Sequence, residues 1–535
     1  MTSLHETLAL RLADAAELVE YGWQERNEWN VRFTILGTIA IISFVSWLFG
    51  PKSIKAPYAG YRSAWEPTFL LRLRFISGAR PIIMDGYNKF KNGMFKLRRM
   101  DSDVLIISNK YVDELRQLPE TIISPIYAHI KNVMGKYTTA DLMLEGNLHT
   151  RVLQAKLTPN LVQYMDIVQQ EMDFAFEVEM PQSDDWTEVQ IGDIILRIIA
   201  RISARTFVGH PLCRNEEWLH ASIHYTENLF MTAFALRMTP TFVHPFLVWL
   251  LPSWYRVHQN LKTAKKLIVP LVKEHAANIA AGNPKGDDTV LKWMMGMAEN
   301  ENEANPNKLA HRQLLLSLAS IHTTGMATTH TLYDLAAHPE YITEMREEVE
   351  SVLIEDGGMT KQTLSKFRKL ESLMKESQRL NPPSYLAFNR TAMKPITLSD
   401  GVQIPKGTHF AVASGPILLD AENNPEPEKF DPLRFYRKRQ NPGEANKHLL
   451  PMTDKNHLHF GHGKYACPGR FFAVLEMKMI LARILLDYEF KYPEGHGRPR
   501  NLTMDENVLP DPAARLLVRN RQGKNHNVPT KYVYA

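Results

Sequence analysis

A strongly apolar stretch lies near the N-terminus, from Phe33 to Gly50. Its eighteen residues carry no charge, and as a helix they would span roughly 27 Å, about the thickness of a bilayer core. A buried core helix is the alternative. However, the stretch has no polar face, carries Trp47 near one end and stops at Pro51. We therefore predict a transmembrane helix over 33–50.

The charges on either side of this helix predict its orientation. Acidic residues outnumber basic ones over residues 1–32, whereas Lys52, Lys55 and Arg62 follow the helix before any acidic residue. Because positive charge marks the cytosolic side, we expect a luminal tail over 1–32 and a cytosolic body. A cleaved signal peptide is disfavoured, since no small-residue cleavage site follows the apolar stretch.

Beyond this segment, the spacing of apolar positions is mainly helical. The Pro-, Gly- and Arg-rich stretch 51–80 shows no regular periodicity and is interpreted as a linker. Strand signals are short, and the clearest lies over 396–414, with turns at 399–401 and 405–407. The body, 81–535, is therefore expected to be one large, mainly α domain with a small β-sheet portion. Apolar residues three and four apart predict its clearest helices over 189–207, 254–281, 307–338 and 340–353.

Charge and cysteine content exclude several classes of protein. The chain has 535 residues, with 63 Lys plus Arg against 58 Asp plus Glu, and its net charge of +5 is modest for a nucleic-acid-binding protein. It has only two cysteines, Cys213 and Cys467. This excludes a disulfide framework, a four-thiolate zinc site and a four-cysteine iron–sulfur cluster. Any metal chemistry through sulfur therefore rests on one or two thiols.

One of these cysteines lies in a glycine-rich loop, FGHGKYACPGRFFA, over 460–473. Gly461 and Gly463 allow a tight turn, and the pattern becomes helical from Arg470. Cys467 should thus precede a helix N-terminus, where backbone amides and the helix dipole favour a thiolate. A single-cysteine metal ligand, a purely structural cysteine and a zinc site are all compatible with this spacing. The zinc site would use Cys467 with His457, His459 and His462.

The loop resembles the haem-binding signature of the cytochrome P450 superfamily, in the order Phe460, Gly463, Cys467 and Gly469. The resemblance implies the cytochrome P450 fold and a haem b cofactor (iron protoporphyrin IX), with the Cys467 thiolate as the iron ligand. It also implies that Phe460 packs beside the cysteine, while Gly463 and Gly469 let the loop lie against the porphyrin. Tyr465 stands where the family commonly has Arg or His, and would give a haem propionate a weaker, neutral hydrogen bond.

Further motifs resemble the family in order and spacing. Glu376 and Arg379, together with Arg434, resemble its buried charge network, although alone they would suggest a surface ion pair. Arg390 resembles the strand arginine that pairs with a haem propionate, with a surface arginine as the alternative. Gln154 stands where a further propionate-binding arginine would align. Cys213 is expected to be an ordinary buried thiol.

The helix expected over 307–338 carries consecutive threonines at its middle, which are poor helix formers because their hydroxyls can bond back to the preceding turn. A loosened, polar mid-helix is therefore predicted. The resemblance places Thr323 at the oxygen-activating position, where its hydroxyl would hold a water or peroxide proton. It places His322 where an acid usually stands. With an ordinary pKa of about 6.5, His322 would relay protons, although a merely packed or solvated histidine is the alternative.

Sequence segments such as GYNKFKNGMFKL and FVGHPLCRNEEWL resemble those of the fungal ent-kaurene-oxidase-like group of the superfamily. This resemblance implies a single-pass endoplasmic reticulum enzyme that inserts oxygen from O2 into a lipophilic terpenoid, a diterpene or indole diterpene, in secondary metabolite biosynthesis. A haem-thiolate isomerase or dehydratase acting without O2 is the alternative, although it would not require Thr323. A zinc-binding protein is a second, more distant alternative.

The chain has no flavin or nicotinamide fingerprint, so its electrons must come from a partner. The expected donor is NADPH–cytochrome P450 reductase, with cytochrome b5 as a second candidate, and no nucleic acid partner is expected. Basic residues near the cysteine loop are the expected docking face, with a solvated surface as the alternative: Arg437, Lys438, Arg439, Lys447, Lys464 and Arg470.

Overall fold

The computed structural model describes residues 54–239, 241–282, 288–525 and 528–529. The predicted luminal tail, 1–32, and the predicted transmembrane helix, 33–50, lie outside the described residues. Within the part of the chain that is described, no helix is both long and apolar enough to cross a membrane.

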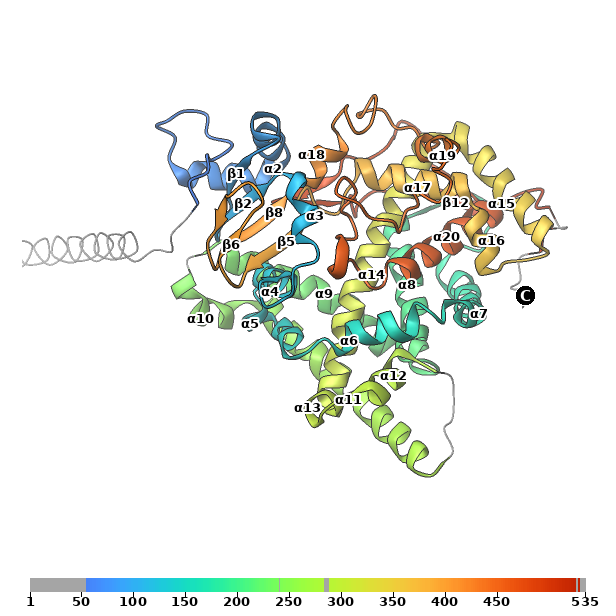
Figure 1. Ribbon diagram of the computed structural model, residues 1–535. Helices are drawn as coiled ribbons and strands as arrows, with labels where there is room; N and C mark the ends of the chain where they lie inside the picture. The colour runs from blue at the N-terminus through green and yellow to red at the C-terminus, as the bar shows by residue number, and fades with distance from the viewer. Residues whose placement is uncertain (1–53, 240, 283–287, 526–527, 530–535) are drawn as a thin grey trace, which may run out of the picture. The chain divides into compact units, whose positions relative to one another are not determined.

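A long helix, α14 (Pro306–Ala337), runs through the middle of the helical region (Figure 1). The Asn305 side chain caps its first turn by accepting from the amide of Asn307, and Pro306 follows at the first helical position. The helices that pack directly on it include α8 (Ile191–Phe207) and α11 (Pro252–Ala280). These correspond to the predicted helices over 307–338, 189–207 and 254–281, which are confirmed to within a few residues.

The other helices surround this centre. The longer ones are α2 (Thr68–Phe90), α7 (Leu161–Glu179), α9 (Glu216–Arg237), α15 (Ile342–Asp356), α17 (Arg368–Leu380) and α20 (Arg470–Asp487). The shorter ones are α3 (Val112–Leu115), α4 (Pro125–Asn132), α5 (Gly135–Thr138), α6 (Leu148–Val152), α10 (His244–Leu247), α12 (Val290–Met297), α13 (Glu301–Ala304), α16 (Lys361–Lys366), α18 (Ser414–Leu418) and α19 (Arg434–Arg439).

A mixed five-stranded sheet lies to one side of the helices (Figure 1). Its order is β1-β2-β8-β5-β3, with β2 and β8 parallel and the other neighbours antiparallel. Its strands are β1 (Met94–Arg98), β2 (Asp103–Ile107), β3 (Ile123–Ser124), β5 (Ala387–Ala392) and β8 (His409–Val412). Smaller sheets are formed by β4 (Thr187–Val189), β12 (Leu516–Asn520) and β9 (Tyr488–Lys491), by β10 (Leu502–Met504) and β11 (Asn507–Leu509), and by β6 (Ile396–Thr397) and β7 (Gln403–Ile404).

The strands predicted over 396–414 are confirmed as β6, β7 and β8. The two predicted turns hold Gly401 at φ +85° and Gly407 at φ +83°, a conformation that glycine adopts without steric cost. Together with the helices, these strands confirm the expectation of a mainly α fold with a small β portion.

The prediction that residues 51–80 lack regular structure is wrong from Thr68 onward, where α2 begins. Leu71, Phe75 and Ala79 recur four residues apart and are at most 1% exposed, so one face of the helix is buried. Arginines on its other face obscured this periodicity. Residues 55–80 therefore belong to the same compact unit as the rest of the body, 55–535.

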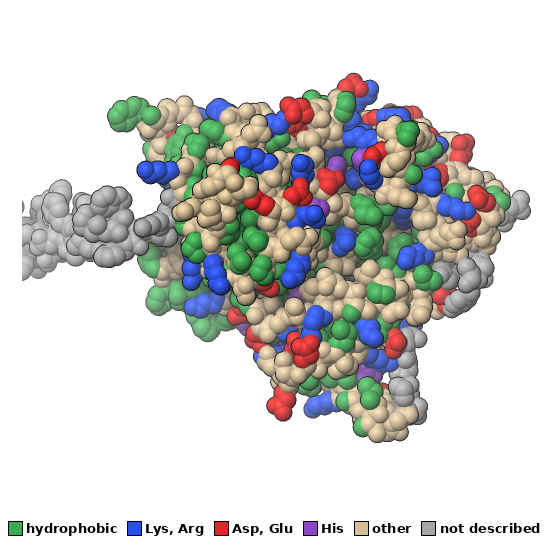
Figure 2. Space-filling model, viewed as in Figure 1, with side chains coloured by type: hydrophobic (Ala, Val, Ile, Leu, Met, Phe, Trp, Pro, Cys, Tyr) green, Lys and Arg blue, Asp and Glu red, His purple; other side chains and the backbone are tan. Residues whose placement is uncertain are grey.

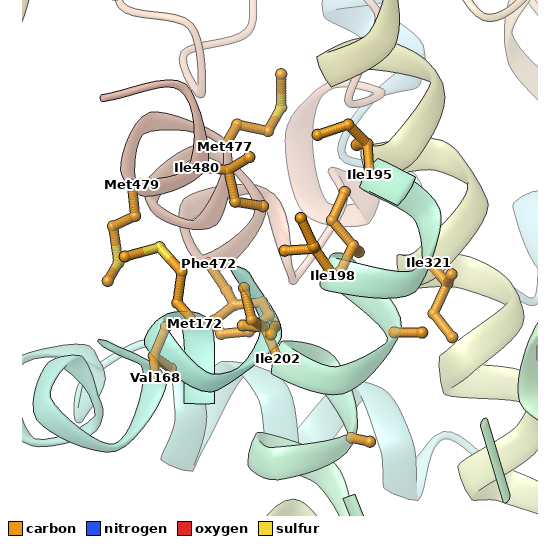
Figure 3. Packing of buried hydrophobic residues seen from close by; sticks show 14 of the residues in the cluster. Val168, Met172, Ile195, Ile198, Ile202, Ile321, Phe472, Met477, Met479 and Ile480 are labelled. Carbon is orange, nitrogen blue, oxygen red and sulfur yellow. The ribbon is translucent and has the colours of Figure 1, made fainter. Parts of the chain in front are cut away.

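The main apolar core lies where α7, α8, α14 and α20 meet. Gly325 allows α8 to approach α14 closely, since a Cβ there would lie 3.1 Å from a methyl carbon of Leu196. Each fully buried aliphatic or aromatic side chain in such a core contributes about 1.5–3 kcal/mol. Figure 3 shows residues from these four helices packed together: Val168, Met172, Ile195, Ile198, Ile202, Ile321, Phe472, Met477, Met479 and Ile480.

The predicted charge network between α17 and α19 is present and buried. Glu376, which is fully buried, accepts from Nε and Nη2 of Arg379, both at 2.8 Å, and from Nε of Arg434 at 3.1 Å. Arg379 and Arg434 also donate to backbone carbonyls nearby, each through Nη2 to that of Lys429. The network thereby fastens the chain before α19 to α17.

We expect Glu376→Gln to lower the free energy of unfolding by about 3–5 kcal/mol, because it leaves two buried arginines without their carboxylate. Denaturant unfolding followed by circular dichroism would measure this. Asp85→Asn is the control, since its pair with Lys89 is exposed and should contribute less than about 1 kcal/mol. Equal effects of the two substitutions would contradict the structural role of the network.

Candidate active site

The loop before α20 folds into tight turns. Gly461 has φ +68° and Gly463 φ +75°, the left-handed region that favours glycine. A Cβ on Gly463 would lie 2.6 Å from the Cβ of Arg116, so a larger residue does not fit there. The amide of Cys467 donates to the carbonyl of Phe460 at 2.7 Å and closes the loop. Phe460 itself packs against the main core. The predicted turn is thereby confirmed.

Cys467 stands just before α20, as predicted, and its side chain is partly exposed. Burial raises the pKa of its thiol, while the amide of Gly469 and the charge and amide of Arg470 lower it. Apart from its chain neighbours, none of the described residues comes within 4 Å of a Cβ placed on Gly469, so the loop leaves room for a group lying against it. These donors and this room suit a single thiolate ligand of a metal-bearing group.

Arg390, on β5, is 2% exposed, so the alternative of a surface arginine is wrong. Its Nη1 donates to the carbonyl of Asn389 at 2.8 Å, whereas Nε and Nη2 have no partner among the described residues. Burial lowers the pKa of this guanidinium to about 10. A buried cation with unsatisfied donors is costly by itself, and a carboxylate would satisfy it.

Tyr465 lies beside this arginine, with its ring centroid 5.6 Å from the guanidinium carbon of Arg390. Its hydroxyl is also buried without a partner among the described residues. The structure thus brings Arg390 and Tyr465 together with unused hydrogen-bonding groups. Such a pair is suited to bind the propionates of a haem. The unpaired donors of Arg390 and Tyr465 are therefore the evidence that the residues of this site fit a haem.

The middle of α14 presents a short exposed stripe. Ala319 and Thr323 are exposed one turn apart, although most of the helix on either side is buried. The Thr323 hydroxyl donates to the carbonyl of Ala319 at 2.7 Å, the back-bond expected for a helical threonine. The helix nevertheless stays continuous from Pro306 to Ala337, so the predicted loosening does not interrupt it.

His322 is held against the neighbouring helix α9. Its Nε2 lies 2.9 Å from the carbonyl oxygen of Ile223, to which it can only donate. Burial lowers the pKa of this histidine. A neutral ring in this position is packed and hydrogen-bonded, so the contact gives no support to the predicted proton relay, which stays a prediction.

The histidines near the loop do not converge on Cys467. The ring of His457 pairs with the carboxylate of Asp454 at 3.1 Å, and that of His462 with the hydroxyl of Thr453 at 3.0 Å. Among the described residues, no three His, Cys, Asp or Glu side chains are placed to hold a metal ion together. The zinc interpretation therefore has no support in the structure.

The segment expected to offer another propionate contact is α6 with the π-helical turn η3 (Leu153–Leu157) that follows it. Gln154, at the position where the family has an arginine, is exposed. The Thr158 hydroxyl donates to the carbonyl of Pro468 at 3.3 Å, which places the end of this segment beside the cysteine loop.

The second cysteine, Cys213, is an ordinary buried thiol, as predicted. It is fully buried, and burial raises the pKa of its thiol to about 12.

One polar contact in the core was not predicted from the sequence. Ser203 of α8, Ser320 of α14 and Glu476 of α20 meet inside the apolar core. They are far apart in the sequence, and the only signal was a single acidic residue within the apolar pattern of α20.

Comparison with known proteins agrees with this geometry. The sequence profile of the cytochrome P450 family matches residues 85–518. A cytochrome P450 monooxygenase of Emericella nidulans is 56% identical over 492 residues, covering 91% of this chain and 92% of the relative. An ent-kaurene oxidase of Fusarium fujikuroi is 42% identical over 525 residues, covering 97% of each.

Among solved structures, retinoic acid-bound cyanobacterial CYP120A1 superposes with a TM-score of 0.64 at 19% identity, covering 88% of this chain and 100% of that one. This likeness shows the fold. The family implies a haem-thiolate cofactor, redox partner proteins and lipophilic substrates. With its signature loop, its buried charge network and its relatives in agreement, the chain belongs to the cytochrome P450 family and is a monooxygenase of that family.

Proposed function

We propose that this protein is a membrane-anchored monooxygenase that inserts one oxygen atom of O2 into a C–H bond of a terpenoid, a diterpene or indole diterpene, in fungal secondary metabolism. The second oxygen atom leaves as water, so each turnover consumes two electrons and two protons. The observation that carries the proposal is the placement of Cys467, partly exposed at the start of α20 in a loop closed by its own amide.

Cys467 would hold the iron of haem b, while Arg390 and Tyr465 would bind its propionates through their unused hydrogen-bonding groups. Thiolate-ligated haem supplies O2 activation, because donation by the sulfur favours O–O cleavage. Phe460 supports the loop from the core, Gly463 allows the loop to pack against Arg116, and Gly469 leaves open space beside the loop. Thr323 holds its hydroxyl on the exposed stripe of α14, where it can accept or donate a proton at Oγ1.

The substrate class rests on the relatives. Ent-kaurene oxidases of Fusarium fujikuroi and Gibberella fujikuroi are 42% and 44% identical to this chain, each over at least 89% of its length. Because fold alone does not fix a substrate, this identity supports the class of terpenoid and not a particular molecule.

Electrons would come from NADPH–cytochrome P450 reductase, or from cytochrome b5 as a second donor. The predicted basic docking face is narrower than the sequence indicated, because Lys438, Arg439 and Arg470 donate to groups of the chain itself. Lys464, in the cysteine loop, is exposed, and so is Lys156 in η3. Lys464 is one of the predicted docking residues and Lys156 is not, and both are suited to contact an acidic partner near the sulfur.

Basic and acidic side chains are interspersed on the face shown in Figure 2, which agrees with the modest net charge. A nucleic-acid partner would favour a stripe of one sign. The proposed soluble partners are accordingly a protein and a small molecule.

Membrane attachment would come from the apolar segment 33–50, with the body on the cytosolic face of the endoplasmic reticulum. Exposed apolar side chains of the body support a membrane-facing surface. Near α2 these are Trp65 and Phe69, 93% and 59% exposed; near α10 they are Phe242, Phe246, Trp249 and Leu250, 59–77% exposed.

For the cofactor, we expect Cys467→Ala to abolish the Soret band that carbon monoxide gives with reduced thiolate-ligated haem. We expect Arg390→Gln to retain that band but to weaken haem retention roughly ten-fold or more, since it removes charge-assisted hydrogen bonds. Absorbance after gel filtration would measure both. Arg256→Gln, an exposed position on α11, is the control. Survival of the band in Cys467→Ala would overturn the assignment.

For the reaction, purified protein with reductase, NADPH and a panel of diterpenes that includes ent-kaurene should give oxygenated product, detected by mass spectrometry with 18O from labelled O2. Thr323→Ala should divert electrons to hydrogen peroxide, and Thr323→Ser should restore product, because it keeps the hydroxyl. Oxidation without any reductase, or label taken from water, would contradict the monooxygenase assignment for this substrate class.

For the membrane, Ile39→Arg combined with Ile42→Arg should release the full chain from microsomes into the carbonate-soluble fraction, since each charge costs about 2.5–3.5 kcal/mol at the bilayer centre. Ile279→Arg, at an exposed position of α11, is the control. Protease added to sealed microsomes should digest the body of the unaltered chain. Protection of the body would show that the orientation is wrong.

A further inference from the structure

A buried lysine lies beside the cysteine loop. Lys375, on α17, is 4% exposed, and its Nζ donates to the carbonyl of Leu449 at 3.1 Å. The same nitrogen lies 4.9 Å from the centroid of the Phe435 ring on α19, a favourable contact between a cation and an aromatic ring. One carbonyl and one ring compensate a buried positive charge only in part, because removing an ammonium group from water is costly without a nearby anion.

The acids around this lysine are engaged with other groups. Asp454 and Glu371 raise the pKa of Lys375, so both act on it electrostatically. However, Asp454 accepts from the ring of His457 at 3.1 Å, and Glu371 pairs with Lys478 at 3.0 Å. Neither forms an ion pair with Lys375, and no other carboxylate among the described residues does so.

The charge of this lysine acts on the cysteine loop. Lys375 and Phe460 line the same small cavity, of about 10 Å³, and the carbonyl of Phe460 accepts from the amide of Cys467. His457 and His459 line this cavity too. Burial lowers the pKa of both rings, that of His459 to about 3, and the charge of Lys375 lowers them further. The residues just before Phe460 therefore lie within the field of the ammonium group.

A haem bound by Cys467 would supply the negative charge that Lys375 lacks. Its thiolate ligand is anionic, and reduction of ferric to ferrous iron adds one more electron to the same site. A fixed cation nearby stabilises the reduced state more than the oxidised state. At an effective dielectric constant of about 20, a unit charge about 10 Å away changes the equilibrium constant for reduction on the order of ten-fold. Charge and burial around the iron are among the means by which proteins set haem potentials.

We propose that the buried ammonium group of Lys375 raises the reduction potential of the haem held by Cys467 and thereby favours electron transfer from the reductase. In that step one electron passes from the reductase to ferric iron, which becomes ferrous. No covalent bond forms or breaks, and Lys375 keeps its proton. Lys375 acts through its charge and is not a catalytic residue. The inference rests on the proposed haem site and is independent of the proposed substrate class.

The first test measures the potential by spectroelectrochemical titration of the haem-loaded full chain. Lys375→Met should lower the potential, by an amount equivalent to a fall in the equilibrium constant for reduction on the order of ten-fold. Lys375→Arg keeps the charge and should stay close to the wild type. Lys369→Met is the matched control and should leave the potential unchanged. Lys369 lies on the same helix, but it is partly exposed and donates to Glu344 at 2.7 Å.

The second test uses the wild-type protein at different pH values. Burial lowers the pKa of Lys375 to about 8, so the ammonium group is charged at pH 7 and loses its proton above about pH 8. The reduced haem holds this proton more tightly than the oxidised haem does. The potential should therefore be constant below about pH 8, fall as the pH rises through that value, and become constant again. Lys375→Met should lack this fall.

Other charged or titratable side chains also act on Lys375 or on its surroundings, and the variant separates their contributions. They are Glu371 on α17, Lys438 and Arg439 on α19, and His448, Asp454, His457 and His459 in the chain before α20. Burial lowers the pKa of Lys438 as well. Only the part of the pH dependence that Lys375→Met removes is therefore assigned to Lys375.

Equal potentials in Lys375→Met and Lys375→Arg would show that the side chain matters only for packing, and would overturn the proposal. So would a wild-type potential that does not fall through pH 8. If Lys375→Met does not retain haem, Lys375→Gln takes its place, because its amide can still donate to the carbonyl of Leu449. A wild-type protein without the Soret band of the reduced carbon monoxide complex would instead show that the haem assignment is wrong.

Discussion

The hydrogen bond from the Cys467 amide to the Phe460 carbonyl, 2.7 Å long, is the contact on which the site depends. It closes the loop and thereby fixes the sulfur just before the first turn of α20. That helix is fixed in turn by its apolar side chains in the core shared with α7, α8 and α14. The position of one sulfur atom is thus set by a single backbone hydrogen bond and by the packing of a whole helix. Glycine at 463 is required by the same geometry, because Arg116 leaves no room for a side chain.

Features that depend on neighbours in the chain could be predicted from the sequence. The helix after Arg470, the turns at Gly401 and Gly407 and the pairing of Glu376 with Arg379 all follow from local spacing. The first turns of α2 could not be predicted, because Arg72 and Arg74 on its outer face interrupt the apolar pattern that Leu71 and Phe75 begin. In that case, tertiary burial of one face decided the structure.

Features that depend on distant contacts were missed or only partly predicted. Nothing in the sequence shows that two donors of Arg390 would be buried without partners, or that Lys438 and Arg439 would bind to the chain itself. The contact of Ser203, Ser320 and Glu476 joins three helices and has no local signature. Glu376 and Glu476 show why such contacts matter. Both are buried glutamates, but Glu376 is compensated by two arginines, whereas Glu476 accepts only from the hydroxyl of Ser203 among the described residues, and burial raises its pKa.

The unequal environments of the two cysteines have a consequence for oxidative damage. Cys213 is fully buried, and its raised pKa keeps it a thiol, so oxidants have little access to it. Cys467 is the partly exposed cysteine: burial raises the pKa of its thiol too, but the amides of Gly469 and Arg470 and the charge of Arg470 oppose that rise. In a chain that has not yet acquired its cofactor, oxidation to sulfenic acid and beyond would therefore fall on the one sulfur atom that the enzyme needs. Because this side chain is not part of the packed core, such a molecule would lose its chemistry while keeping its fold, and measures of folding would not reveal the damage.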